Sequence, residues 1–400
     1  MDFQTPSTPF FDFISSNIYG DPKNLLLKNH GKSFDFNVEF AITQIECRQK
    51  GKHKLPHLIS NPNIIFPTSL AYEQASHERV AAYHASLVKT GSKVVDMTAG
   101  LGIDAMAFAE NKCNVTACEY DPLKADVLRY NAGVLKLDNL TVVNIDSIKY
   151  IKEMKEKCDV IFIDPARRSK ENRRLYNLHD CTPDILGIMD SAIKKCTTLI
   201  IKASPLLDIS QTLKDIPATG KISAVSVGGE CKEVLIIAEN GASVQTYEAI
   251  DLSTDGRINY QFSFSPSHDG RGVEYSEKKD VLPGRYLYEP GAAVMKLNPW
   301  SELCTHFPGI KKLSQSSHLF VSHILFESFP GRILRIDSLP DKKSRQTLKG
   351  SPANVVTRNY PLSTEELRKN LGVKEGNDQF IYGTRLGKTP ILIAATRIRI

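Results

Sequence analysis

The sequence has few of the features that mark disulfide-rich or metal-binding proteins. It contains eight cysteines and one tryptophan in 400 residues, and no two cysteines form a Cys-x-x-Cys pair. Thiols this sparse do not make a disulfide scaffold, so we expect reduced cysteines that act mainly as small core residues. His53 and His57 are four residues apart, but Pro56 disrupts the helix that would align them. The sequence therefore predicts no metal site.

Long apolar runs are also absent. No stretch approaches the roughly 18 uncharged apolar residues that a membrane-spanning helix needs. The N-terminal stretch has no basic residue ahead of its apolar part, which argues against a secretory signal. Hydrophobic residues make up 41% and charged residues 24% of the chain, as in ordinary soluble proteins. We therefore expect a cytoplasmic protein of several domains without a membrane partner; its oligomeric state stays open.

Positive charge is concentrated at one end of the chain. The formal net charge is +6, and residues 321–400 hold 14 Lys and Arg against 7 Asp and Glu. The rest of the chain is nearly neutral. A basic end on a neutral body is typical of an appendage that binds a polyanion, although a soluble domain that is merely basic fits the same counts.

The order of expected elements divides the chain into four regions. These are a mainly helical region at 1–90, an alternating α/β domain at 91–245, a small α+β domain at 246–320 and a basic α+β end at 321–400. In the alternating domain, short strands and helices predict βαβ units and a parallel sheet. An antiparallel hairpin around Gly228 and Gly229 ends it. The predicted fold class is α/β, a doubly wound Rossmann-like sheet closed by that hairpin.

The helical region is predicted to end in one continuous helix. Apolar residues recur at helical spacing from about Ser69 to Lys89, after an N-cap at Thr68 or Ser69. Gln74 and Glu78 are then one turn apart on this helix, just before the sheet. We expect them to close over a ligand bound at the sheet.

Residues 94–105, VVDMTAGLGIDA, carry the strongest chemical signal. A strand leads into Ala99, Gly100 and Gly102, and a helix follows. The glycines let a ligand approach the backbone closely, and the helix N-terminus offers unpaired N–H groups. The pattern also fits the weak Gly-x-Gly-x-x-Ala fingerprint of dinucleotide-binding proteins, so an NAD-dependent oxidoreductase is an alternative.

Acidic residues at three successive strand ends favour a different cofactor. Asp96 is placed to bind the cationic amino group of a methionine moiety, whereas it would repel a pyrophosphate. Glu119, next to Tyr120, can accept both hydroxyls of a ribose. Asp146 with Ser147 can reach an adenine edge. Together with the hairpin, this order resembles the class I methyltransferases, a resemblance that implies S-adenosylmethionine (SAM) as the cofactor.

The loop after the fourth strand resembles the D/N-P-P-x loop of methyltransferases that act on nucleobases. It consists here of Asp164, Pro165, Ala166, Arg167 and Arg168. The resemblance implies that Asp164 binds the acceptor, with Pro165 stiffening the loop. Arg167 replaces the aromatic residue usual in enzymes that methylate exocyclic amines. An arginine there is similar to the loop of 5-methyluridine methyltransferases, but the segment KASPLLD lacks the cysteine that C5 chemistry requires.

Further polar residues are candidates for contact with the substrate. Arg167 and Arg168, with Arg173 and Arg174 beyond them, are able to bind phosphate or to pair with acidic neighbours. Glu230 and Lys232 lie in the turn of the expected hairpin, which we expect on the same side as the strand ends. A solvated turn is the alternative for this pair.

Seven segments together resemble the bacterial class I methyltransferases that end in a THUMP-like domain. They are EQASHE, VVDMTAGLGID, DPARR, KASPLLD, VGGECKE, YEPGAAVMK and RNYPLSTEELRK. The resemblance implies a catalytic domain at 91–245, a ferredoxin-like piece after it and a THUMP-like end. It implies methylation of RNA, with tRNA as one option, and Asp164, Pro165 and Arg167 as catalytic residues. Methylation of a protein or small molecule, and RNA binding by a non-catalytic methyltransferase fold, are the alternatives.

Overall fold

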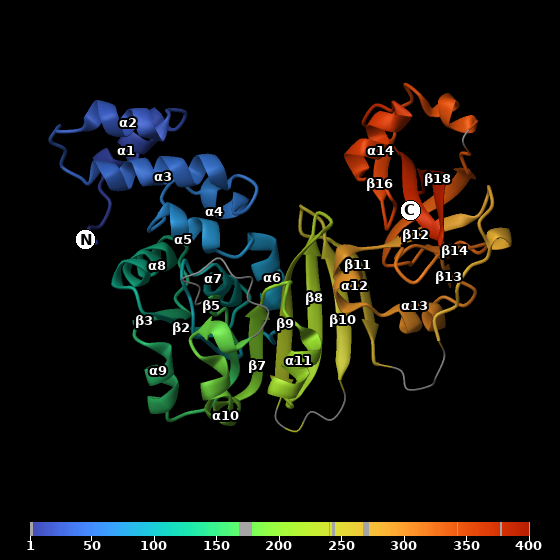
Figure 1. Ribbon diagram of the computed structural model, residues 1–400. Helices are drawn as coiled ribbons and strands as arrows, with labels where there is room; N and C mark the ends of the chain where they lie inside the picture. The colour runs from blue at the N-terminus through green and yellow to red at the C-terminus, as the bar shows by residue number, and fades with distance from the viewer. Residues whose placement is uncertain are drawn as a thin grey trace. The chain divides into compact units, whose positions relative to one another are not determined.

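The computed structural model describes residues 3–167, 178–239, 241, 245–266, 272–341, 343–376 and 378–399 (Figure 1). The chain divides into two compact units. Unit 1 comprises Met1–Ile222, Glu233–Ser243 and Thr254–Gly256, and unit 2 comprises Ser223–Lys232, Val244–Ser253 and Arg257–Ile400. In the described part, no helix is long and apolar enough to cross a membrane.

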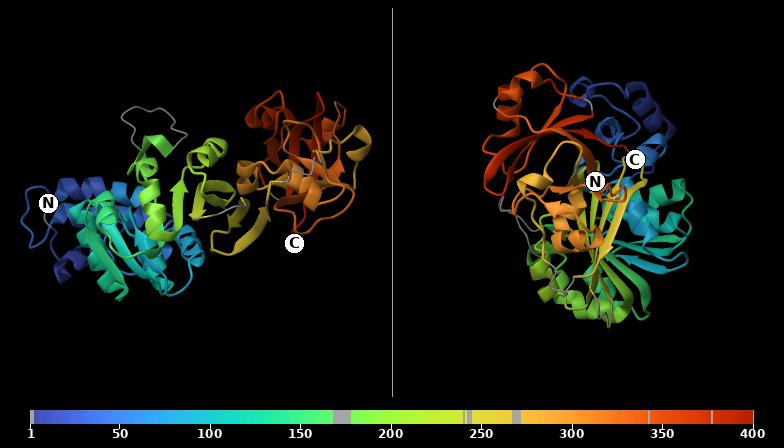
Figure 2. Two further views of the ribbon diagram at one scale, coloured as in Figure 1. Left: turned by 90° about the horizontal axis from the view of Figure 1, so that it is seen from below. Right: turned by 90° about the vertical axis from the view of Figure 1, so that its right-hand side faces the viewer.

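Unit 1 begins with short helices that pack on one another. They are α1 (Thr8–Asn17), α2 (Pro22–Asn29), α3 (Val38–Gly51), α4 (Pro56–Ser60), α5 (Ser69–Gln74) and α6 (Glu78–Ser86). Asp21 and Asn37 cap α2 and α3 by accepting hydrogen bonds from the N–H groups of Asn24 and Phe40. Buried apolar residues of α1, α2 and α3 form one core, and Figure 2 shows these helices side by side at one end of the unit.

The helix predicted from Ser69 to Lys89 is interrupted in the structure. Thr68 caps α5 as expected, by accepting a hydrogen bond from the N–H of Ala71. The backbone then leaves the helix at Ala75, where ψ is 155°. Residues 75–77 are extended, and α6 starts with His77 as its N-cap. Gln74 therefore ends one helix and Glu78 begins the next, so the two are not one turn apart on a single helix.

The sheet of unit 1 has the strand order β9-β7-β4-β1-β2-β3. The strands are β1 (Lys93–Asp96), β2 (Asn114–Glu119), β3 (Leu140–Asn144), β4 (Cys158–Ile163), β7 (Cys196–Ala203) and β9 (Glu230–Glu239). The first five run parallel to their neighbours, and β9 pairs antiparallel with β7. The carboxyl ends of β1, β2, β3 and β4 therefore meet at one edge, where ligands bind in open α/β sheets.

Helices connect the parallel strands, as the alternating pattern predicts. They are α7 (Ile103–Glu110), α8 (Pro122–Val134), α9 (Ser147–Glu153), α10 (Ile185–Lys195) and α11 (Ile209–Asp215), with the short pair β5 (Ala166–Arg167) and β6 (Cys181–Thr182) and the turn η1 (Leu178–Asp180) between β4 and α10. Apolar residues of β4, β7 and α10 pack into a shared core that includes Ile161, Leu199 and Ile188. This packing fixes the loops at the strand ends.

The predicted hairpin is present and joins the two units. Strand β8 (Thr219–Val227) turns into β9 at Gly228 and Gly229, whose φ angles are 61° and 82°. Such left-handed backbone is accessible to glycine at low cost, which explains both residues. The start of β8 and most of β9 belong to unit 1, whereas Ser223–Lys232 belong to unit 2.

Unit 2 contains a second, mostly antiparallel sheet. Its strand order is β13-β14-β12-β15-β18-β17-β16, and only the β16–β17 pair is parallel among the described pairings. The elements of this unit are β10 (Thr246–Leu252), β11 (Ile258–Phe264), η2 (Lys278–Asp280), β12 (Tyr286–Pro290), α12 (Ala292–Leu297), α13 (Trp300–His306), β13 (Lys311–Lys312), β14 (Phe320–Ser322), β15 (Gly331–Ser338), η3 (Ser344–Leu348), β16 (Asn354–Thr357), α14 (Thr364–Leu371), β17 (Gln379–Leu386) and β18 (Thr389–Arg397). Ser363 and Glu366 form a reciprocal capping box on α14.

Candidate functional site

A cavity of about 1070 Å³ lies at the carboxyl edge of the sheet in unit 1. Its walls come from the ends of β1, β2, β3 and β4 and from the segment that joins α5 to α6. Many residues predicted from the sequence line it, namely Gln74, Ala99, Gly100, Gly102, Glu119, Tyr120, Asp146, Ser147, Asp164 and Pro165. The structure therefore brings together, in one space, residues that are up to 91 positions apart in the chain.

The glycine loop forms one wall of this cavity. Gly100 and Gly102 have φ angles of 56° and 84°, in the left-handed region that glycine favours. A Cβ atom at Gly102 would lie 2.1 Å from Cδ1 of Leu128, so the loop packs directly on α8. At Gly100 the nearest atom to such a Cβ is the Thr98 carbonyl oxygen at 3.8 Å. The space in front of Gly100 is thus open to a ligand.

Glu119 ties the glycine loop to the end of β2. Its Oε2 accepts a hydrogen bond from the N–H of Gly100 at 2.7 Å, and its Oε1 accepts one from the N–H of Asp121 at 2.8 Å. Tyr120 beside it is 78% exposed. At the next strand end, Asp146 caps α9 by accepting a hydrogen bond from the N–H of Lys149. Carboxylates at both strand ends therefore border the cavity.

Asp96 is placed differently from the other acidic strand ends. Its side chain is buried, it accepts a hydrogen bond from the N–H of Thr98 at 2.9 Å, and it is not among the residues that line the cavity. Burial raises the pKa of Asp96 well above its usual value. Its contact with an amino group stays a prediction.

Asp164 lies at the end of β4 and faces the cavity. Its backbone N–H donates to Oγ1 of Thr98 at 2.7 Å, which fixes the start of the loop. Its Oδ2 accepts a hydrogen bond from Nζ of Lys202 at 2.5 Å. Burial raises the pKa of the Asp164 carboxyl, and Lys202 opposes this effect.

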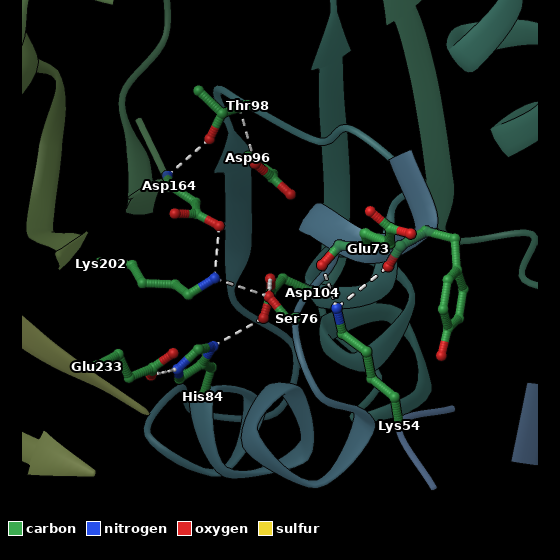
Figure 3. Close-up of polar contacts among 11 residues, drawn as sticks. Lys54, Glu73, Ser76, His84, Asp96, Thr98, Asp104, Asp164, Lys202 and Glu233 are labelled. Atoms are coloured by element: carbon green, nitrogen blue, oxygen red, sulfur yellow. Dashed lines mark hydrogen bonds and ion pairs between the residues drawn. The ribbon is translucent and has the colours of Figure 1, made fainter. Parts of the chain in front are cut away.

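Lys202 connects Asp164 to a chain of buried polar groups (Figure 3). It also donates to Oγ of Ser76 at 3.0 Å, and Ser76 donates to Oδ2 of Asp104 at 2.5 Å. The chain continues through His84, whose Nδ1 lies 2.7 Å from Oδ1 of Asp104 and whose Nε2 contacts Glu233. The contacts thus join four elements of unit 1, β7, α7, α6 and β9, to the loop after β4 and the segment between α5 and α6.

The pKa values within this chain indicate that its basic groups are charged. Burial alone would lower the pKa of His84, but Glu233 and Asp104 raise it to about 10. Burial likewise disfavours the charged form of Lys202, but Asp164, Glu233 and Asp104 raise its pKa. For Asp104, burial is outweighed by His84 and Lys202, and its pKa is lowered. His84 is therefore an imidazolium at neutral pH.

Sequence reasoning did not identify this chain of groups. Asp104 and His84 occur within helices that read as apolar, and Glu233 occurs within a strand whose next five residues are all buried. The one signal that could have identified them is a charged residue within an apolar segment. Such a signal does not tell with which other residue the charge is paired. Lys202 is in the KASPLLD segment, which contributes to the family resemblance and lacks the cysteine of C5 chemistry, but no role was predicted for the lysine itself.

The remaining predicted residues have other settings. Arg167 pairs through its backbone in β5 with Cys181 of β6. Glu78 accepts a hydrogen bond from the N–H of His57 and does not line the cavity. Glu230 and Lys232 form an ion pair at 2.5 Å and belong to unit 2. Three further arginines lie outside the described residues, Arg168, Arg173 and Arg174.

The cavity suits an adenosyl cofactor that carries a positive charge. The open backbone at Gly100 offers room for a close approach, and carboxylates at Glu119 and Asp146 offer acceptors for hydroxyl and amine groups. A third acidic group, Asp164, borders the same space. These negatively charged acceptor groups fit a cationic sulfonium better than a pyrophosphate. Among the described residues, no group of His, Cys, Asp and Glu is arranged to hold a metal ion.

Comparisons with known families agree with this geometry. Residues 27–176 match the family described as "Putative SAM-dependent methyltransferase". Residues 286–330 match a ferredoxin-like domain and residues 331–397 match a THUMP domain-like family. Fold, site and family match thus all point to the class of SAM-dependent methyltransferases. Along the chain, the matched methyltransferase region is followed by regions similar to ferredoxin-like and THUMP-like domains. The fold class predicted from the sequence is confirmed, and these matches agree with the predicted enzyme class and cofactor.

Relatives of known name are methyltransferases that act on ribosomal RNA. Ribosomal RNA small subunit methyltransferase J of Coxiella burnetii is 30% identical over 150 residues, which cover 34% of this chain and 59% of that protein. The protein of the same name from Shewanella sediminis is 29% identical over 147 residues, which cover 32% and 56%. The chain therefore spans less than two thirds of the length of these relatives.

One solved structure resembles the whole chain. It is described as the "Crystal structure of putative methyltransferase from Porphyromonas gingivalis W83". The two chains are 25% identical, the TM-score is 0.84, and the match covers 98% of each. The similarity thus extends along the full length, and not only over the part that matches the ribosomal RNA enzymes.

Proposed function

We propose that this protein transfers the methyl group of SAM to RNA, with Asp164 positioning the acceptor. The observation that carries the proposal is the placement of Asp164. Its carboxylate and the glycine loop line the same cavity, and one of its oxygens is already held by Lys202. The ribosomal RNA methyltransferases to which the chain is similar support RNA as the acceptor. A tRNA acceptor and a cytoplasmic location stay predictions.

The residues of unit 1 would hold the cofactor at the strand ends. Glu119 is placed to bind ribose hydroxyls, Asp146 and Ser147 to contact an adenine edge, and the Gly100 backbone to lie against the methionine part. When bound, SAM supplies an electrophilic methyl group on a sulfonium. Nothing in the proposal requires a nucleophile from the protein.

Catalysis would then consist mainly of orientation. In-line transfer needs the acceptor atom, the methyl carbon and sulfur in a row, and holding them so removes an entropic barrier. Asp164 would bind the acceptor on one side of the cavity, with Pro165 restricting the loop. The end of α5 at Gln74 and the segment that follows it through Ser76 border the same space and would limit the entry of water.

Features of unit 2 support a nucleic acid partner. Its own cavity, of about 1280 Å³, is lined by four arginines, namely Arg332, Arg358, Arg397 and Arg399. Arg332 and Arg358 both bind the buried carboxylate of Glu289, at 2.5 and 2.7 Å. Two cations on one carboxylate leave a net positive charge, and planar guanidinium groups suit phosphate. With Arg397 and Arg399 counted, the four lining arginines outnumber the three lining carboxylates, Glu289, Asp251 and Glu327, by one.

The decisive experiment compares wild type with Asp164→Ala. RNA from cells that lack the protein would be incubated with labelled SAM, and the modified nucleoside identified by mass spectrometry. We expect turnover to fall on the order of 10²-fold, as when one well-placed polar contact to a transition state is removed. SAM affinity, measured by calorimetry, should change little. Wild-type turnover by Asp164→Ala would refute the assigned role, and label found only in protein or small molecules would exclude RNA as the acceptor.

A further inference from the structure

Lys202 is the least expected residue near the candidate site. Its side chain is only 14% exposed, yet it carries a charge at the carboxyl end of β7. It does not line the cavity, but both groups to which it donates, Asp164 and Ser76, do so. Burying a charged lysine costs free energy unless the charge is paired. The presence of Lys202 here is therefore best explained by its contacts with Asp164 and Ser76.

The two oxygens of the Asp164 carboxylate have different surroundings. Oδ2 accepts the hydrogen bond from Lys202 at 2.5 Å. No residue in the described ranges hydrogen-bonds to Oδ1, and Asp164 borders the cavity. Because Lys202 restrains one oxygen, the other is held in one direction and is available to a ligand (Figure 3).

The remaining groups of the chain fix Lys202 in turn. Ser76 accepts the second hydrogen bond of Lys202 and donates its own hydroxyl hydrogen to Asp104. His84 in turn binds Asp104 and also contacts Glu233. Three carboxylates and two cations then leave one net negative charge behind the cavity. Such a charge favours a sulfonium cation in front of it.

From this geometry we infer that Lys202 is a positioning residue. It keeps Asp164 ionised and directs the free oxygen, Oδ1, to a hydrogen-bond donor on the methyl acceptor. The inference rests on the proposed function and deepens it, because it limits the acceptor to N–H or O–H groups. A ring carbon, or a ring nitrogen without hydrogen, does not make this contact.

The pH dependence of turnover distinguishes this role from a purely structural one. Charged groups approach Asp164 from several elements: Lys202 of β7, Asp104 of α7, Glu233 of β9 and Asp96 of β1, with His84 of α6 behind Asp104 and Glu233. Among the side chains that the structure describes next to Asp164, Lys202 is the one with a positive charge. Without it, burial and the neighbouring carboxylates raise the pKa of Asp164 further, so the ionised form requires higher pH.

The test uses Lys202→Met and the conservative Lys202→Arg in the full chain, with the RNA and SAM assay described above. We expect Lys202→Met to lower kcat on the order of 10²-fold at pH 7 and to shift the acid limb of its pH profile upward by about one unit or more. Lys202→Arg should recover most of the activity. KM for RNA and the affinity for SAM should change less than about threefold, because Lys202 touches neither.

A matched control separates this effect from loss of stability. Lys195 is also partly buried in unit 1, donates to the backbone carbonyls of Lys152 and Met154, and does not line the cavity. Lys195→Met should therefore lower stability without moving the pH profile. If Lys202→Met does not fold, Lys202→Met in an Asp164→Asn background removes the unpaired charge. In that background the lysine substitution should lower kcat no further.

The outcomes also separate this inference from the proposed function. No methylation of RNA by wild type overturns the proposed function itself. Methylation of RNA at carbon, or at a ring nitrogen without hydrogen, overturns the inference alone. So does a Lys202→Met enzyme that keeps the kcat and pH profile of wild type, or a double variant whose losses simply add.

Discussion

The carboxylate of Glu119 shows how one residue shapes the cofactor site. It accepts hydrogen bonds from two backbone N–H groups, at Gly100 and Asp121, and still borders the cavity. Substitution by Ala should thus remove a ribose acceptor and also loosen the glycine loop. We expect the Kd for SAM in calorimetry to rise at least about tenfold, which is roughly 1.4 kcal/mol. Glu119→Gln, which keeps one acceptor oxygen, should lose less. Unchanged affinity in Glu119→Ala would exclude this ribose contact.

His84 provides a prediction about stability and pH. Its pKa is about 10 in the folded protein, against 6.5 without the fold, because Glu233 and Asp104 surround a buried ring. A raised folded pKa stabilises the protein fully below about pH 6.5, and this contribution is lost as pH rises through 10. The free energy of unfolding in urea should accordingly fall between pH 7 and 10. His84→Gln should be less stable at pH 7 and should show a smaller fall. Equal slopes in the two proteins would contradict the charged state of His84.

At the scale of elements, the glycine loop of unit 1 packs so closely on α8 that one added methyl group should disturb it. Gly102→Ala would place a methyl group 2.1 Å from Leu128 Cδ1, at a φ of 84° that disfavours any side chain. The left-handed backbone alone costs about 1–2 kcal/mol, and the overlap adds to it. Gly91→Ala is the matched control, since its φ is 86° and a Cβ there meets nothing within 4 Å.

Thermal unfolding and SAM calorimetry would measure both alanine variants. Gly102→Ala should lose more stability than Gly91→Ala, and it alone should weaken SAM binding, because only Gly102 lines the cavity. Similar losses of stability in the two variants would show that the loop relaxes away from α8. Similar losses of affinity would show that the loop does not shape the cofactor site.

Local sequence patterns predicted some elements and missed others for a physical reason. The alternating strands, the Gly228–Gly229 hairpin and the capping box at Ser363 follow from residues close together in sequence. The break between α5 and α6 does not. Apolar spacing continues across it, and Ser76 leaves the helix where it binds Asp104 and Lys202, which are 28 and 126 residues away. Tertiary contacts of this kind override helix propensity, and no local pattern contains them.

The residues of the candidate site also fall into two groups, those that a local sequence pattern predicts and those that only tertiary packing places. Glu119, Asp146 and Asp164 were identified because each lies at the end of a strand or just after it, and parallel strands end at one edge. Lys202, Asp104 and His84 face the same region from elements whose partners are set by packing. The position of Asp96, buried and away from the cavity lining, also depends on how its strand packs. Residues at strand ends can thus be predicted from the sequence, whereas the buried residues that bind them from behind, such as Lys202 and Asp104, cannot.

At the scale of the whole molecule, the main question is where RNA affinity resides. The excess of basic residues lies in 321–400, which matches the THUMP-like family over most of its length. The cavity of the candidate cofactor site lies in unit 1, whereas residues 321–400 belong to unit 2. If RNA binds through the basic end, substitutions there should change RNA affinity without changing SAM affinity.

Charge reversal at Lys342, Lys343 and Arg345 tests this separation. Lys343 is exposed and Arg345 half-buried in the segment around η3, and Lys342 lies outside the described residues. Each phosphate neutralised adds about 0.7–0.9 to the slope of log affinity against log salt, through release of counterions. Reversal should therefore flatten the slope of RNA binding, measured by fluorescence anisotropy across a salt series, by roughly that amount for each phosphate no longer neutralised.

Reversal of Lys23, Lys28 and Lys32, which are exposed in unit 1, changes the net charge equally and should leave the slope nearly unchanged. Equal effects of the two triple variants would mean that only net charge matters, and wild-type slopes in both would remove the η3 segment from the interface.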